Sequence, residues 1–142
     1  PPMTALGLAA RAGHVETARA LLDAGADPDE SSNIAEGRTG TTPLVLSASE
    51  GHVETIRLLV ERGAQPNTPQ ADGLTPLMAA ADAGHLEAVR ALVEARANIN
   101  LIHLLDPNQP FTALDLARLR GHREVVAFLE ARDAIAMVQG KK

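Results

Sequence analysis

The dipeptide Gly-His recurs four times along the chain, and this recurrence constrains the fold more than any other feature of the sequence. Its histidines are separated by steps of 38, 33 and 37 residues (His14, His52, His85 and His122). A Thr stands ten residues before each histidine, and an Ala stands twelve residues after it (Thr4, Thr42, Thr75 and Thr112; Ala26, Ala64, Ala97 and Ala134). The spacing inside each unit is fixed while the connections vary. The sequence therefore predicts four copies of one structural unit, with a base period of 33 residues and insertions of 5 and 4 residues.

Each unit is predicted to contain two antiparallel helices. Thr is a good N-cap residue, and Pro43 and Pro76 follow it at the first helical position, where proline is tolerated. The Gly of each Gly-His dipeptide ends the first helix, and Gly25 and Gly63 end the second helices of the first two units. In unit two the second helix has a one-sided apolar stripe (Val53, Ile56, Leu59 and Val60). One such pair cannot bury its own apolar face, so the units must stack.

Composition limits the classes of protein to which the chain can belong. It is 45% hydrophobic and 22% charged, as a soluble globular protein is, but only 1% aromatic, so its core must consist of closely packed small side chains. The formal net charge is −5 and the longest basic run is Lys141-Lys142, which argues against nucleic acid as the main partner. No apolar run is long enough to span a membrane, and there is no Cys. We expect an intracellular, cytoplasmic monomer.

Two stretches carry a resemblance to a known family. One is Asp72-Gly73-Leu74-Thr75-Pro76-Leu77-Met78-Ala79-Ala80, followed by Gly84-His85-Leu86-Glu87, and the other is Thr42-Pro43-Leu44 with Gly51-His52-Val53-Glu54. Over about residues 3–135 the chain resembles the ankyrin-repeat family. The resemblance implies an all-α solenoid, with four stacked helix-turn-helix repeats and projecting finger loops. The implied organisation is a single domain, 1–142, with repeats at about 3–36, 37–69, 70–106 and 107–138 and a flexible tail at 139–142.

The chain departs from the family pattern at several positions. The family usually has His after Thr-Pro-Leu, and here the equivalent residues are Gly7, Val45, Met78 and Asp115. The hydrogen-bond network that this His normally joins is therefore expected to be missing. Arg96 and Asp133 replace the Gly after the second helix in units three and four, and unit one has no leading finger. We expect units two and three to be regular and units one and four to be caps.

No constellation of residues points to catalysis or to a cofactor. The four Gly-His histidines could form a metal ladder or could simply begin the second helices. The second interpretation is favoured, because packed helices lie roughly 8–10 Å apart, whereas zinc needs ligand nitrogens at about 2 Å. His103 stands alone in a loop with no catalytic partner. Because no hydrolase, zinc-protease or Walker motif is present, we predict that the chain is not an enzyme and has no catalytic, metal or cofactor site.

The two inserted connections, 27–41 and 98–111, are candidate binding loops, because insertions in repeat proteins often lie on the binding face. The first is polar. The second contains an apolar cluster (Leu101, Ile102, Leu104 and Leu105). Burial of this cluster on unit four is favoured over exposure to a partner, since apolar patches of that size are uncommon on monomers.

The resemblance implies binding through the finger tips and the concave face of the first helices. The positions of this chain that match that surface run from unit two to unit four (Arg38, Thr39, Thr41, Ser49, Glu50, Ala71, Asp72, Leu74, Asp82, Ala83, Asn108, Gln109, Phe111, Leu119 and Arg120). Leu74 and Phe111 occupy equivalent finger positions and either pack on neighbouring fingers or protrude as anchors. We predict a non-catalytic module that binds another protein. The alternatives are a targeting or regulatory segment of a larger enzyme or effector, and a structural or self-associating stack.

Overall fold

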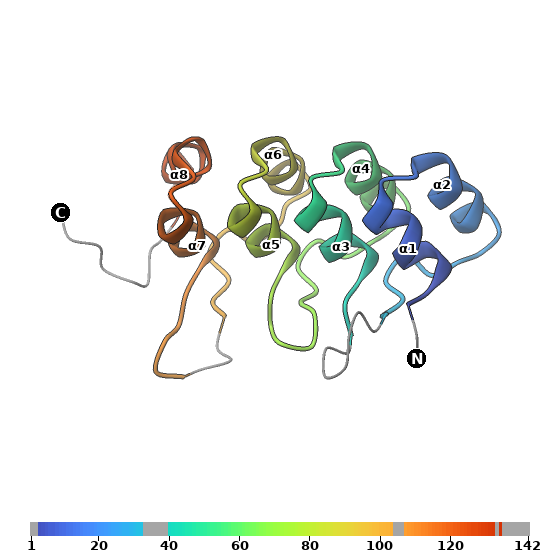
Figure 1. Cartoon of the computed structure of the whole chain (residues 1–142), viewed down its shortest axis with the longest axis horizontal. Coiled ribbons are helices and arrows are strands. Elements are labelled where there is room, and N and C mark those ends of the chain that lie inside the picture. The colour runs from blue at the N-terminus through green and yellow to red at the C-terminus, as the bar shows by residue number, and fades with distance from the viewer. Residues whose placement is uncertain (1–2, 33–39, 104–106, 133, 135–142) are drawn as a thin grey trace.

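The computed structural model describes residues 3–32, 40–103, 107–132 and 134. These residues form eight helices, in four antiparallel pairs (α1 Ala5–Ala12, α2 Val15–Asp23, α3 Pro43–Glu50, α4 Val53–Glu61, α5 Pro76–Ala83, α6 Leu86–Glu94, α7 Ala113–Arg120 and α8 Arg123–Glu130). The pairs stack in chain order, with the first helices in one row and the second helices in another (Figure 1). The loops between units project beyond the row of first helices (Figure 1). The predicted all-α solenoid of four helix pairs is confirmed.

The first helices begin and end as the repeated Thr and Gly predict. In every unit the Thr hydroxyl accepts a hydrogen bond from the backbone N–H three residues on, as Thr75 does from Met78 at 3.2 Å. In every unit the Gly of the Gly-His dipeptide is the C-cap, with φ between 73° and 76°. This left-handed conformation is open to glycine without strain, and it lets the second helix begin two residues later.

In units one and two the second helices end in the C-cap residues Ala24 and Arg62. The Gly residues predicted to end these helices come one residue later. Gly25 and Gly63 come directly after the cap residues and both have φ of 97°. In unit three the equivalent residue is Arg96, which has φ of 67°. It is the only non-glycine residue with positive φ in the described part of the chain. The backbone turn is therefore kept even where the sequence no longer supplies a Gly.

The core lies between the first helices and continues beneath the second helices. The middle of α3 and of α5 is buried all round, because each packs between two other first helices. The residue three before the C-cap Gly is completely buried in the first three units (Ala10, Ala48 and Ala81). An alanine at this position lets neighbouring helices approach closely. The second helices bury one side, which in α6 carries Ala88, Val89, Ala91 and Leu92.

The loops after the second helices also connect neighbouring units. Asp29 Oδ1 accepts a hydrogen bond from the backbone N–H of Gln65 at 3.0 Å. Asn67 Oδ1 accepts one from the backbone N–H of Asn98 at 2.6 Å. Both bonds join a side chain of one unit to the main chain of the next unit, so they hold the units in register.

Units one and four form hydrogen bonds that the departures from the family pattern did not predict. In unit one, Ser32 Oγ accepts from the Thr4 backbone N–H at 2.9 Å, and a Cβ on Gly7 would lie 2.6 Å from that oxygen. The missing side chain at position 7 therefore makes room for Ser32. In unit four, Asp115 Oδ2 accepts from both the backbone N–H and the hydroxyl of Thr112, at 2.9 Å and 3.1 Å. Both terminal units thus anchor their helix-capping Thr by a bond of their own.

Candidate functional site

The four histidines are structural, and three of them join neighbouring units. The rings of His52, His85 and His122 lie against the C-cap glycines of the preceding units, where an added Cβ would come within 2.6–2.7 Å of a ring atom. His52 Nε2 donates to the carbonyl oxygen of Arg11 at 3.0 Å, and His122 Nε2 donates to that of Asp82 at 2.9 Å. Sequence reasoning placed these residues at helix starts but missed their contacts between units.

The described residues contain no group of three or more His, Asp or Glu side chains that could hold a metal ion. The four histidines belong to different units, and His52, His85 and His122 each pack on a glycine of the preceding unit. The expectation of no metal site remains a prediction. Within the same residues, no helix is long and apolar enough to cross a membrane.

The finger of unit four is held together by a ring stack. His103 and Phe111 form an antiparallel bridge, and their rings lie 4.4 Å apart at an interplanar angle of 10°. His103 is only 5% exposed. His103 therefore has a ring partner that sequence analysis did not foresee, while the expectation that it has no catalytic partner remains a prediction. The ring partner is eight residues away, and no spacing rule for helices or tight turns connects them.

The apolar cluster of the second inserted loop is divided rather than buried as a unit. Leu101 is partly buried against the core, whereas Ile102 is 43% exposed. Leu104 and Leu105 lie outside the described residues. Leu101 is therefore partly buried and its neighbour is exposed, and both line a hollow formed with the finger of unit three.

The residues predicted to bind a partner differ in exposure. Arg38 and Thr39 lie outside the described residues. Thr41 was placed on the exposed surface, but it is only 1% exposed, and its backbone pairs with Ser32 in an antiparallel bridge. That assignment is corrected. The others are exposed or partly exposed (exposed: Glu50, Ala71, Ala83, Asn108, Gln109, Leu119 and Arg120; partly exposed: Ser49, Asp72, Leu74, Asp82 and Phe111).

Of the two equivalent finger residues, neither protrudes freely. Leu74 and Phe111 are both partly buried and pack against the hydrophobic core. The backbone N–H of Leu74 donates to Asp72 Oδ1 at 3.0 Å, which closes the finger tip of unit three. These contacts favour the packing interpretation for both residues while leaving one side of each side chain accessible.

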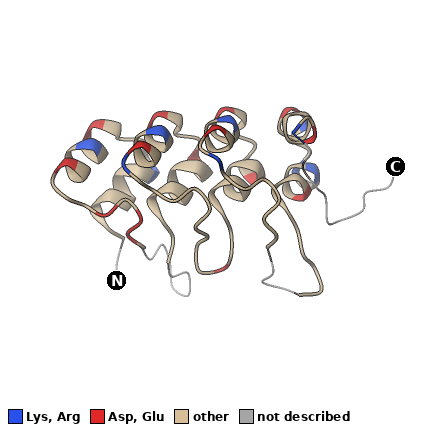
Figure 2. Cartoon of the chain, turned by 180° about the vertical axis from the view of Figure 1, so that it is seen from behind, with Lys and Arg blue, Asp and Glu red and all other residues tan. Residues whose placement is uncertain are grey.

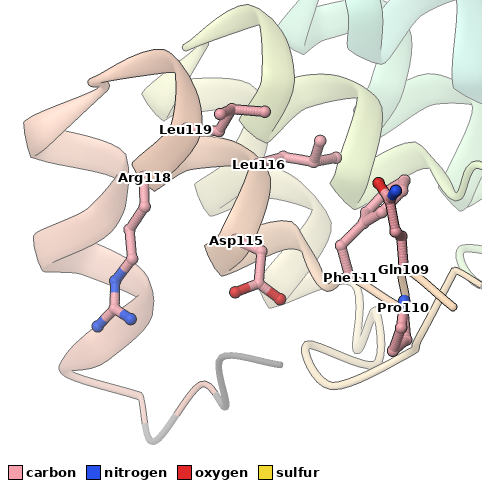
Figure 3. Close-up of a pocket in the computed structure, with 7 residues that line it drawn as sticks. All are labelled: Gln109, Pro110, Phe111, Asp115, Leu116, Arg118 and Leu119. Carbon is pink, nitrogen blue, oxygen red and sulfur yellow. The ribbon is translucent and has the colours of Figure 1, made fainter. Parts of the chain in front are cut away.

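An apolar hollow of about 540 Å³ lies between the finger and the first helix of unit four. The finger contributes Gln109, Pro110 and Phe111, and α7 contributes Asp115, Leu116, Arg118 and Leu119. The side chains of Leu116 and Leu119 point from α7 toward the finger side of the hollow (Figure 3). Its volume falls within the roughly 300–1,000 Å³ typical of ligand pockets.

Three of the residues lining this hollow were predicted from the sequence (Gln109, Phe111 and Leu119), and four were missed (Pro110, Asp115, Leu116 and Arg118). One signal was available: Leu116 precedes Leu119 by three residues, so both must lie on the same side of α7.

Arg118 lines the hollow, and Arg120 lies two residues further along α7. Both arginines form ion pairs. Arg118 Nη2 lies 3.0 Å from Glu130 Oε1, and Arg120 Nε lies 2.8 Å from Asp82 Oδ1. The hydrogen bond to Asp82, together with the charge of that carboxylate, raises the pKa of Arg120 above its usual value. Ion pairs that are exposed to solvent in this way are weak, so these arginines can exchange their partners for another anion at little cost.

Large exposed apolar side chains are confined to the first helices and the loops. Among the described residues there are three: Leu8 on α1, Ile102 in the second inserted loop, and Leu119 on α7. The second helices instead carry charges of both signs on their exposed side (Figure 2). We call the exposed last turns of α1, α3, α5 and α7, together with the loops that precede them, the first-helix face.

The structure is that of a helical-repeat solenoid protein. Its helix pairs stack, their first helices all have a Thr N-cap and a Gly C-cap, and a histidine of each following unit packs on the preceding one. A family model described as ankyrin repeats (3 copies) matches residues 2–70 and again residues 64–137, so the chain belongs to the ankyrin-repeat family. No curated protein matches it. Ankyrin repeats are generally protein–protein interaction modules, and domains of this kind are typically non-catalytic.

Proposed function

We propose that this chain is a non-catalytic binding module whose partner protein lies along the first-helix face. The observation that carries the proposal is the distribution of exposed apolar side chains. Leu8, Ile102 and Leu119 all belong to first helices or loops, and no second helix within the described residues exposes a comparable side chain. A contiguous apolar surface is typical of interaction sites, and Leu119 belongs to one, because it lines the same hollow as Phe111 and Leu116.

The absence of a chemical site in the described residues agrees with this proposal. His52, His85 and His122 form contacts between units, and the buried carboxylate of Asp115 caps α7. The glutamates at the starts of the second helices stand near the positive end of the helix dipole (Glu16, Glu54, Glu87 and Glu124). These polar residues therefore have structural roles, which supports a binding function.

Self-association by stacking of a second copy onto unit four is disfavoured by one residue. Arg118 occupies the position at which Ala10, Ala48 and Ala81 are completely buried by the next unit. Burying the Arg118 guanidinium in the same way would remove it from water and from Glu130, which is costly. A partner that covers the first-helix face can leave the Arg118 guanidinium in an ion pair and so avoids this cost.

Site-specific photo-crosslinking tests the proposed face. A benzophenone amino acid is placed at Ser49, Ala83 or Leu119 on the first-helix face and, as matched controls, at Thr17, Arg57 or Glu124 on second helices. All six positions are exposed or partly exposed, so the substitutions spare the core. We expect the same partner protein to be crosslinked from the first set in the cells that produce the chain, and not from the second. Crosslinks from the second-helix positions alone contradict the proposed face.

A further inference from the structure

Unit four differs from the other units on the first-helix face. The residue two before the C-cap Gly is polar in units one to three (Arg11, Ser49 and Asp82) but is Leu119 in unit four. Leu119 is 77% exposed, the largest exposure of the three large apolar side chains that are exposed among the described residues. The fold therefore does not need a leucine here, since its three equivalents show that a polar residue serves equally well.

A second residue of α7 is also accessible. The residue five before the C-cap Gly is buried in units two and three, where Leu46 is 5% and Ala79 is 3% exposed, and it is exposed in unit one, where Leu8 is 54% exposed. Its equivalent in unit four, Leu116, is only partly buried and lines the hollow of about 540 Å³ beside Leu119. Phe111, which is fixed by its stack on His103, forms the opposite wall. The hollow thus has preformed apolar walls on two different elements.

The charged groups at this hollow are a buried carboxylate and exposed, ion-paired arginines. The finger side of the hollow is uncharged (Gln109, Pro110 and Phe111), and Asp115, its one acidic residue, is nearly buried and is bonded to Thr112. The exposed charged group of the lining is Arg118, with Arg120 two residues further along α7. A carboxylate placed at this edge gains an arginine partner in exchange for a weak surface pair. A cation there would face Arg118.

We propose that the hollow of unit four is the anchor site for the partner protein, and that it accepts a segment carrying a bulky aliphatic or aromatic side chain beside an Asp or Glu. This inference rests on the proposed function and specifies where and by what chemistry it operates. The apolar side chain fills the space between Phe111, Leu116 and Leu119. The acidic side chain pairs with Arg118.

The probe for the test is a phage-displayed library of short random peptides, selected on the whole chain. We expect the enriched peptides to share a bulky apolar residue adjacent to an acidic one. The most enriched peptide is then labelled with fluorescein, and its dissociation constant is measured by anisotropy against the unaltered chain and its variants.

The expected responses differ in sign among the variants. Leu119→Arg weakens binding at least about tenfold, because it removes an apolar anchor and partly blocks the hollow. Ala20→Arg is the matched control, because it places the same charge at an exposed position of the second helix α2, outside the first-helix face, and it leaves binding unchanged. Arg118→Gln weakens binding about threefold, and Glu130→Gln strengthens it about threefold, since it removes the anion that competes for Arg118. Circular dichroism of each variant verifies that the helices remain.

Several results overturn the inference. These are the absence of any enriched peptide, a consensus that is basic or lacks an acid, tolerance of Leu119→Arg, and shifts of the same sign for Arg118→Gln and Glu130→Gln. If binding is instead lost in Ser49→Arg or Ala83→Arg but not in Leu119→Arg, the first-helix face remains the binding surface and only the anchor site is wrong. If none of these variants affects binding, the proposed face fails as well.

Discussion

The junction between a C-cap glycine and the histidine of the next unit provides the sharpest test of how the stack is held together. In Gly84→Ala, a methyl group enters at a residue with φ of 76°, and its Cβ would lie 2.6 Å from the ring of His122. The ring cannot move away freely, because its Nε2 donates to the carbonyl oxygen of Asp82 at 2.9 Å. The substitution therefore introduces backbone strain and a steric clash at the same point.

The two contributions can be estimated separately. A non-glycine residue in the left-handed region costs roughly 1–2 kcal/mol. Overpacking against a fixed neighbour typically costs about 1–3 kcal/mol. Gly84→Ala should therefore lower the free energy of unfolding by about 2–5 kcal/mol. Gly63→Ala is the matched control, because Gly63 is also internal, has φ of 97° and has no atom within 4 Å of its added Cβ. In this variant the free energy of unfolding should fall only by the cost of backbone strain, about 1–2 kcal/mol.

The measurement is urea denaturation followed by circular dichroism, because the chain has no Trp or Tyr for fluorescence. A third variant combines Gly84→Ala with His122→Ala. Because the ring is absent, this variant should not lose the part of the unfolding free energy that the steric clash removes, so the two substitutions should show a favourable coupling energy. Equal losses for Gly84→Ala and Gly63→Ala, or strict additivity in the double variant, would refute the idea that the ring and the glycine are fitted to each other.

Two further predictions concern helix ends. Thr75→Ala should lower the free energy of unfolding by about 1–2 kcal/mol, because the Thr75 hydroxyl caps α5 at the Met78 N–H; a neutral urea midpoint would mean that this cap contributes nothing. Arg96→Gly should raise stability by up to about 1 kcal/mol, since relief of left-handed strain exceeds the entropy that glycine adds to the unfolded chain. Arg96→Ala serves as the control for loss of the side chain and should give no such gain in the same denaturation experiment.

The binding surface was only partly predictable from the sequence. Gln109, Phe111 and Leu119 were identified because they match finger and first-helix positions of the family, and all three line the hollow. Thr41 was assigned to the surface by the same rule, yet it is buried, and its backbone pairs with Ser32. Position within a repeat predicts which side of a helix a residue is on, but the path of an inserted loop decides whether that side is covered.

The sequence by itself determined the repeat, the helix pairs and their boundaries. Capping by Thr and Gly depends on residues within a few positions of each other, so it can be recognised from spacing alone. Only the tertiary structure decided what each histidine does, why residue 7 is a glycine, and where an apolar hollow remains. These features depend on contacts between units, such as His52 with Gly13 or Ser32 with Thr4, whose partners are brought together by stacking and not by sequence spacing.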